Sequence, residues 1–170
     1  YTIKGKITNP TRDFIEFKKK TAPSTQKDTI KLNKDGEFMI NINPDTLTAY
    51  TLIYGEDSRP DTLGGNSEAQ RGLIVLNQTQ QMTLMVDSGY SIGISLDTKD
   101  PDNTISITGK GSEYNLYVVK KEMLNRDFNL KYVKMIKSGP EEFVKFIDDY
   151  KSSLEKLINT LPQSSVYMPQ

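Results

Sequence analysis

The stretch that decides the fold is Val-Asp-Ser-Gly-Tyr-Ser-Ile-Gly-Ile-Ser-Leu-Asp at residues 86–97, together with Thr-Ile-Ser-Ile-Thr-Gly-Lys-Gly at residues 104–111. In both runs apolar side chains alternate with polar or small ones. Strict alternation with a period of two is typical of a strand that has one buried and one solvent-facing side. Beyond residue 111 the period becomes helical. The sequence therefore predicts a β-rich body over residues 1–110 and a helical tail over residues 111–170.

Earlier residues repeat the alternating pattern in short runs, separated by turn-forming residues and without a helical period between them. These runs lie at residues 1–8, 13–18, 29–32, 37–42, 49–54, 73–76 and 82–86. Short strands of this kind predict an antiparallel β-sandwich. Within it we expect residues 13–18 to pair with residues 1–8. We also expect Asp35-Gly36 to close a hairpin between residues 29–32 and 37–42, because Gly can adopt the positive φ of such a turn.

The tail predicts two helices. Ser112 is the candidate cap of the first, and Ser138-Gly139-Pro140 followed by two acidic residues marks the start of the second. Apolar residues then recur three and four positions apart as far as Leu161-Pro162, which predicts an amphipathic helix. Its apolar stripe needs a partner: the first helix, the sandwich or another chain. The candidate interaction surface on this stripe consists of Phe143, Phe146, Tyr150 and Leu154.

Composition excludes several classes of function. The 170 residues contain 22 basic and 22 acidic side chains and no Cys, His or Trp. Without Cys or His the chain has no thiol nucleophile, no Ser-His-Asp triad and no usual zinc site, so we expect neither an enzyme nor a cofactor. Balanced charge argues against nucleic acid and against an anionic membrane surface. No apolar run approaches the roughly 20 residues that span a bilayer. Because the chain opens on a strand without Met, we expect a mature or trimmed chain.

One loop concentrates acidic residues. Residues 97–103 hold Asp97, Asp100 and Asp102 beside an Asn, and oxygen-rich turns of this kind can bind calcium. The spacing is not that of an EF-hand loop, and the closing Glu is missing. The sequence favours a solvated hairpin loop, with these three carboxylates as the candidate metal ligands.

Other patterns leave alternatives open. Tyr50, Tyr54 and Tyr90 fall on predicted strands, where they either pack in the core or form an aromatic binding face for peptide or glycan. The polar stretch at residues 55–72 is the loop that such a binding module would use. A hydrolase with paired carboxylates would need two acids in one cleft, and Glu37, Asp87 and Asp97 are the candidates. Residues 109–112, Gly-Lys-Gly-Ser, lack the spacing of a phosphate-binding loop. The favoured interpretation is that they form the boundary between a strand and a helix.

The order of these features resembles a known family. The features are the opening strand at residues 1–7, Asp35-Gly36-Glu37-Phe38 before a strand, residues 86–92, residues 105–109, and Glu113-Tyr114-Asn115. Together, over residues 1–115, they resemble the domain of unknown function that precedes thioredoxin-like modules in exported thiol-disulfide oxidoreductases of Bacteroidetes. Where that family has Pro-Gly-Asp before a strand, this chain has residues 87–90, Asp-Ser-Gly-Tyr. The helices are similar to the linker that leads to the redox module.

The resemblance implies an accessory role. We expect a non-catalytic interaction domain of an exported, periplasmic or cell-surface protein, lipid-anchored in its parent. Its partner would be a neighbouring thioredoxin-like domain, another protein or a second copy of the chain. The redox chemistry would belong to a downstream module that is not among these residues. The alternative hypothesis is a peptide- or glycan-binding β-sandwich that acts alone.

Overall fold

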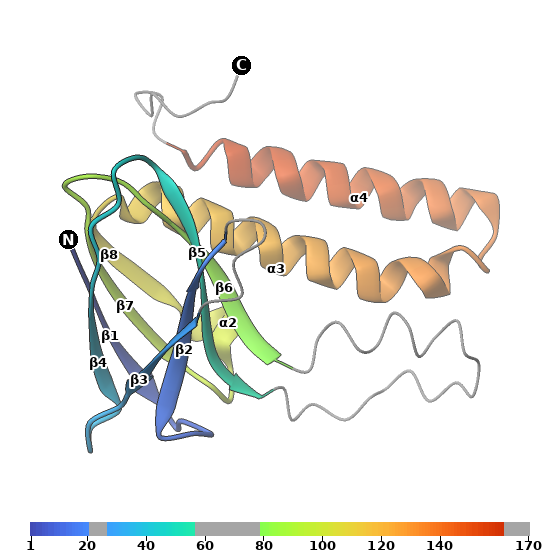
Figure 1. Ribbon diagram of the computed structural model, residues 1–170. Coiled ribbons are helices and arrows are strands. Elements are labelled where there is room, and N and C mark those ends of the chain that lie inside the picture. Colours follow the sequence, from blue (N-terminus) through green and yellow to red (C-terminus); the bar gives the residue numbers. More distant parts are fainter. Residues whose placement is uncertain (21–26, 57–78, 162–170) are drawn as a thin grey trace.

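The computed structural model describes residues 1–20, 27–56 and 79–161, which form two stacked four-stranded sheets and a long helix hairpin (Figure 1). The first sheet has the order β4 (Glu37–Asn41), β1 (Thr2–Thr8), β7 (Ser91–Asp97), β8 (Ser106–Lys110). The second has the order β3 (Lys27–Lys31), β2 (Phe14–Lys19), β5 (Thr48–Glu56), β6 (Thr79–Val86). The predicted sandwich with a helical tail is confirmed. The predicted strand at residues 73–76, and the predicted loop beyond residue 56, lie outside the described residues.

The core lies between the two sheets and is filled by the alternating apolar positions. Along β7 and the residue before it, every second side chain from Tyr90 to Leu96 is less than a tenth exposed, as the alternation predicts. Phe17 of β2 stacks on Tyr50 of β5 with ring centroids 4.8 Å apart. The largest fully buried side chains come from both sheets and from one helix: Phe17, Ile3, Ile7, Ile15, Leu52, Leu84, Ile92, Val86, Val119 and Asn115.

Two predicted strand pairings are wrong. β1 pairs with β4 in antiparallel and with β7 in parallel orientation, whereas β2 lies in the other sheet between β3 and β5. The connection that crosses between the sheets begins at Asn9, whose φ of 52° turns the chain, and continues into Pro10. Adjacent alternating runs therefore face one another across the core instead of pairing edge to edge.

The second error concerns the turn at Asp35-Gly36. The turn forms, with Gly36 at φ 75°, and a Cβ at Gly36 would lie only 2.2 Å from the Ile7 carbonyl oxygen. However, β3 and β4 belong to different sheets, so no hairpin ladder follows. Ile30 and Phe38 still point into the shared core. The turn is a corner of the sandwich.

The helices begin at the glycine positions of the sequence. α3 (Ser112–Met135) is preceded by its N-cap residue, Gly111, which has a φ of 91°. The predicted capping role of Ser112 is wrong, because Ser112 is already the first helical residue and makes no capping hydrogen bond. A residue with a side chain does not fit at position 111, because its Cβ would lie 2.3 Å from the Tyr90 ring. α4 (Pro140–Ile158) begins as predicted, with Pro140 in its first turn and Glu141 and Glu142 after it. A short helix, α2 (Pro101–Thr104), lies in the β7–β8 connection. No described helix is long and apolar enough to cross a membrane.

The two lateral sides of the sandwich differ. α3 packs against both β6 and β8, and so closes the side where these two edge strands meet; this is the closed side. β3 and β4 are the edge strands of the opposite side, and no described helix packs across them; this is the open side. The far half of α3 continues past the sandwich, and α4 packs back along α3 (Figure 1).

Candidate functional site

Side chains of α3 form hydrogen bonds with the outward backbone groups of the edge strand β6. The fully buried Asn115 accepts a hydrogen bond from the Met85 backbone N–H (2.7 Å) and donates to the Met85 carbonyl oxygen (2.8 Å). About two helical turns later, Glu122 Oε2 accepts a hydrogen bond from the Thr83 N–H at 2.9 Å. A buried backbone group without a hydrogen-bond partner lowers the stability of the fold. The side chains of α3 therefore make the hydrogen bonds that a further strand beside β6 would make. This seam is structural.

A polar cluster continues along the same helix. Arg126 forms an ion pair with Asp102 at 2.5 Å, and the Lys120 ammonium donates to the Asp102 carbonyl oxygen at 3.0 Å. Arg126 also lines a hollow of about 370 Å³ between α3 and the second sheet, together with Gln80 and Glu122. Gln80 donates to the Thr98 carbonyl oxygen at 2.9 Å. The two contacts of Asp102 attach the β7–β8 connection to α3, and the Gln80 bond attaches it to β6.

The three candidate metal ligands have separate partners. Asp97 accepts hydrogen bonds from the Asn9 amide (2.9 and 3.0 Å) and the Lys99 backbone N–H (2.9 Å), and these two donors, Lys99 first, hold the Asp97 pKa below its ordinary value. Asp100 accepts from the Asn103 side chain at 3.0 Å. Asp102 pairs with Arg126. Over residues 1–20, 27–56 and 79–161, no group of three or more His, Cys, Asp or Glu is placed to hold a metal ion.

The hydrolase candidates are also directed to different neighbours. Glu37 lies on the edge strand β4, where its carboxylate accepts from the Asn33 amide at 3.0 Å. Asp87 follows β6 and accepts from the Ser88 N–H at 2.7 Å. Asp97 ends β7 and holds Asn9. Each of these three acids therefore has its own local role within the described part of the chain.

The three tyrosines on the strands are core residues. Tyr50, Tyr54 and Tyr90 are 8 %, 3 % and 7 % exposed. Burial, with the charge of Asp45 second, raises the pKa of Tyr50. None of the three can present a ring to a glycan or a peptide, so the aromatic binding face anticipated as one alternative is not formed by them.

The predicted interaction residues of α4 face α3. The rings of Phe146 and Tyr150 both contact the Phe128 ring, with centroids 4.9 and 4.2 Å from it. The Tyr150 hydroxyl donates to Asn125 Oδ1 at 2.6 Å. Phe143 packs on Tyr132 at 5.9 Å, and Leu154 is half-buried on the same stripe. The first helix is thus the partner of this stripe. No residue of α4 is fully buried.

A second apolar face is left exposed near the turn of the hairpin. Ile136 and Val144 are 59 % and 58 % exposed, and Tyr132 is 37 % exposed. Tyr132 and Ile136 are four residues apart, and Val144 and Ile147 three apart, so each pair shares one side of its helix. The contact between Tyr132 and Phe143 joins the two sides. We call Tyr132, Ile136, Phe143, Val144 and Ile147 the hairpin face; it lies at the end of the hairpin farthest from the sandwich (Figure 1).

Of the hairpin face, only Phe143 was predicted as an interaction residue; Ile147 belongs to the predicted apolar stripe of α4. Val144 lies off the regular apolar stripe of α4, and Ile136 stands in the turn between the helices. An apolar side chain outside the stripe of an amphipathic helix is the signal that would have identified them. Asn115 and Glu122 were also missed as seam residues, since their role depends on the edge of β6, which lies about thirty to forty positions away in the chain.

No family model, curated protein or solved structure matches the chain.

Proposed function

We propose that this chain is a non-catalytic interaction domain that contacts a protein partner through the hairpin face. The observation that carries the proposal is that apolar side chains are exposed at the free end of the helix hairpin. Ile136 and Val144 are more than half exposed at the end of a hairpin whose second helix, among the described elements, packs mainly on α3. Exposed apolar groups that gather on one face of a soluble domain are typical of a contact surface for another protein.

The geometry of the hairpin supports a docking role. α3 is anchored in the sandwich by Val119, which is 1 % exposed, and by the seam with β6. Its far half carries α4 away from the sandwich as an arm, in which ring contacts around Phe128 hold the two helices together. An arm of this kind presents its end to a neighbour without disturbing the core. Absence of Cys and His from the sequence agrees with a role that involves no thiol or imidazole chemistry.

We further propose that the domain belongs to an exported cell-envelope protein and lies on the N-terminal side of a thioredoxin-like module. The support is the resemblance of residues 1–115 to the domains found in that position. Reading the parent open reading frame on both sides tests this part. An export signal upstream and a Cys-x-x-Cys module downstream are the expected result. A frame without either would contradict the assignment and would leave the interaction role of the hairpin face to stand on its own.

A charge substitution tests the docking role. Ile136→Glu combined with Val144→Glu places two carboxylates on the hairpin face without removing a buried contact, so the fold is retained while apolar docking is lost. The control is Lys145→Glu, a neighbouring exposed position on another side of α4. The measurement is binding of the separately purified downstream module by isothermal titration calorimetry, and self-association by sedimentation velocity. We expect the double variant to weaken association at least about tenfold, as loss of roughly 1.4 kcal/mol would do. Unchanged association in both assays would contradict the proposal.

A further inference from the structure

The backbone of β4 has a free edge. Among the described strands, β4 is the last of its sheet and has β1 as its one partner. The Ile42 N–H donates to the Tyr1 carbonyl oxygen, and the Ile7 N–H donates to the Gly36 carbonyl oxygen, both at 2.9 Å. In an antiparallel ladder these bonds alternate along the strand. Phe38 and Ile40 therefore direct their backbone groups toward β1, whereas Glu37, Met39 and Asn41 direct theirs toward the open side.

One of these three residues is already occupied. The Glu37 N–H donates to Asn33 Oδ1 at 2.8 Å, and the Glu37 carbonyl oxygen accepts from the Asn33 N–H at 2.9 Å. Within the described part of the chain, no residue takes up the backbone groups of Met39 or Asn41. The Asn33 turn thus ends the accessible edge at Glu37, and an added strand would be held in register beyond it.

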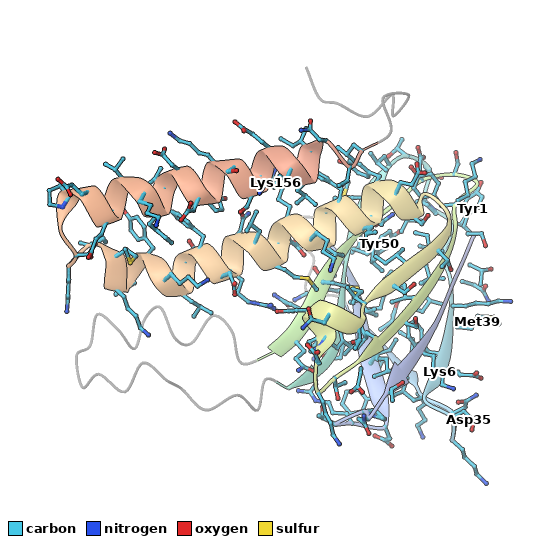
Figure 2. All side chains as sticks on the ribbon, turned by 180° about the vertical axis from the view of Figure 1, so that it is seen from behind. Tyr1, Lys6, Asp35, Met39, Tyr50 and Lys156 are labelled. Atoms are coloured by element: carbon cyan, nitrogen blue, oxygen red, sulfur yellow. The ribbon has the colours of Figure 1, made fainter. Side chains whose placement is uncertain are left out.

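The side chains of β4 do not protect this edge. Proteins commonly block exposed edges with Lys, Pro or a bulge. The neighbouring edge strand β3 has Lys27, Asp28 and Lys31. β4 has the sequence Glu-Phe-Met-Ile-Asn, with one charge and no Pro, and Met39 at its centre is 53 % exposed. Met39 and Lys6 lie on the side of the sandwich away from the helix hairpin (Figure 2).

The surroundings select the chemistry of an added strand. A hollow of about 600 Å³ extends from β4 across β1 to β7 and β8, where Ser95 and Thr108 are among its lining residues. At its β4 end it is lined by Lys4, Lys6 and Lys31, with Glu37 as the acid among the lining residues. Lys4 is the β1 partner of Met39, and Lys6 is the partner of Glu37. On the inner side the hollow reaches Ile30 and Phe38. Successive side chains of a strand point to opposite faces, so the occupant would need acidic residues outward and apolar residues inward.

We propose that the free edge of β4 binds an extended peptide as an added strand, and that this peptide alternates apolar and acidic residues. Backbone hydrogen bonds to Met39 and Asn41 would supply affinity, and the lysines and the apolar inner wall would supply selectivity. The inference concerns a different surface from the hairpin face and does not rest on the proposed docking role.

The test uses the whole chain and the synthetic peptide acetyl-Val-Glu-Val-Glu-Val-Glu-amide, followed by amide NMR. We expect chemical-shift changes and slower hydrogen exchange at Met39 and Asn41. Met39→Pro removes the outward-facing donor together with the exposed Met39 side chain. Proline is tolerated at a sheet edge, and binding should weaken about tenfold. Thr29→Pro is the matched control: the Leu32 N–H donates to the Asp13 carbonyl oxygen, so Thr29 is also outward-facing, but on β3. It should leave binding unchanged.

A second variant keeps the test independent of proline effects. Lys4→Glu with Lys6→Glu should abolish the preference for the acidic peptide over one in which Lys replaces Glu. Equal binding to the Met39→Pro variant and the parent chain would overturn the proposal, as would equal binding of a sequence-scrambled peptide. Protection of Met39 and Asn41 that rises with chain concentration in the absence of peptide would also overturn it, because the occupant would then be a second copy. The Ile136→Glu variant should bind the peptide normally, which separates this result from the docking test.

Discussion

The closed and open sides of the sandwich differ in how the outward backbone groups of their edge strands are hydrogen-bonded. Each side has two edge strands with backbone groups that face outward. On the closed side α3 covers them, and Asn115 and Glu122 accept or donate the hydrogen bonds that another strand would make. On the open side the turn residue Asn33 hydrogen-bonds the backbone of Glu37, and within residues 1–20, 27–56 and 79–161 nothing bonds the outward backbone groups of Met39 and Asn41. The comparison shows that the chain protects the edge that supports its arm and leaves the other edge available.

The largest difference in stability is expected when one asparagine on each side of the sandwich is replaced by alanine. Asn115→Ala removes three hydrogen bonds and leaves the Met85 N–H and carbonyl oxygen buried without partners, so the free energy of unfolding should fall by about 2–4 kcal/mol. Asn41→Ala, at the exposed edge of β4, should change it by less than about 0.5 kcal/mol. Urea denaturation measures both. Similar losses for the two variants would mean that α3 does not seal its side as described.

A smaller effect is expected where the first sheet meets the connection between the sheets. The Lys99 N–H and the Asn9 amide lower the Asp97 pKa, so the stability that this carboxylate contributes is present above its unfolded-state pKa and is lost as pH falls through the lower folded-state pKa. Asn9→Gly keeps the positive φ and removes one donor. The Asp97 pKa should rise toward its ordinary value, and acid unfolding should begin at slightly higher pH. Carboxyl NMR titration would detect this rise, and an unaltered titration curve would assign the depression to Lys99 alone.

The sequence predicts buried faces well and strand partners poorly, for a physical reason. Alternation at Tyr90, Ile92 and Ile94 depends only on which side of each strand meets the core, and the structure confirms it. Strand pairing depends on contacts between distant residues. The Asp35-Gly36 turn is compatible both with a hairpin and with a corner between sheets, and local turn chemistry cannot decide between them.

The same limit applies to the helices. α4 has one clear apolar stripe, and its position against α3 follows from it. α3 contacts the sandwich on one side and α4 on another, so its apolar residues form no single stripe. Its most buried polar residue, Asn115, is fully enclosed because it serves the edge of β6, and a sequence pattern gives no sign of that edge. Val144 was missed because it lies off the apolar stripe of α4, and Ile136 because it stands in the turn between the helices.

Native-state hydrogen exchange of the free chain tests the difference between the two sides most directly. At concentrations where the chain is monomeric, the Thr83 and Met85 amides should exchange slowly, because their acceptors lie on α3, and Glu122→Ala should accelerate Thr83. The Met39 and Asn41 amides should exchange near the rate of an unstructured peptide. If Met39 and Asn41 were as protected as Thr83 and Met85, the open side would be covered and the account would be contradicted.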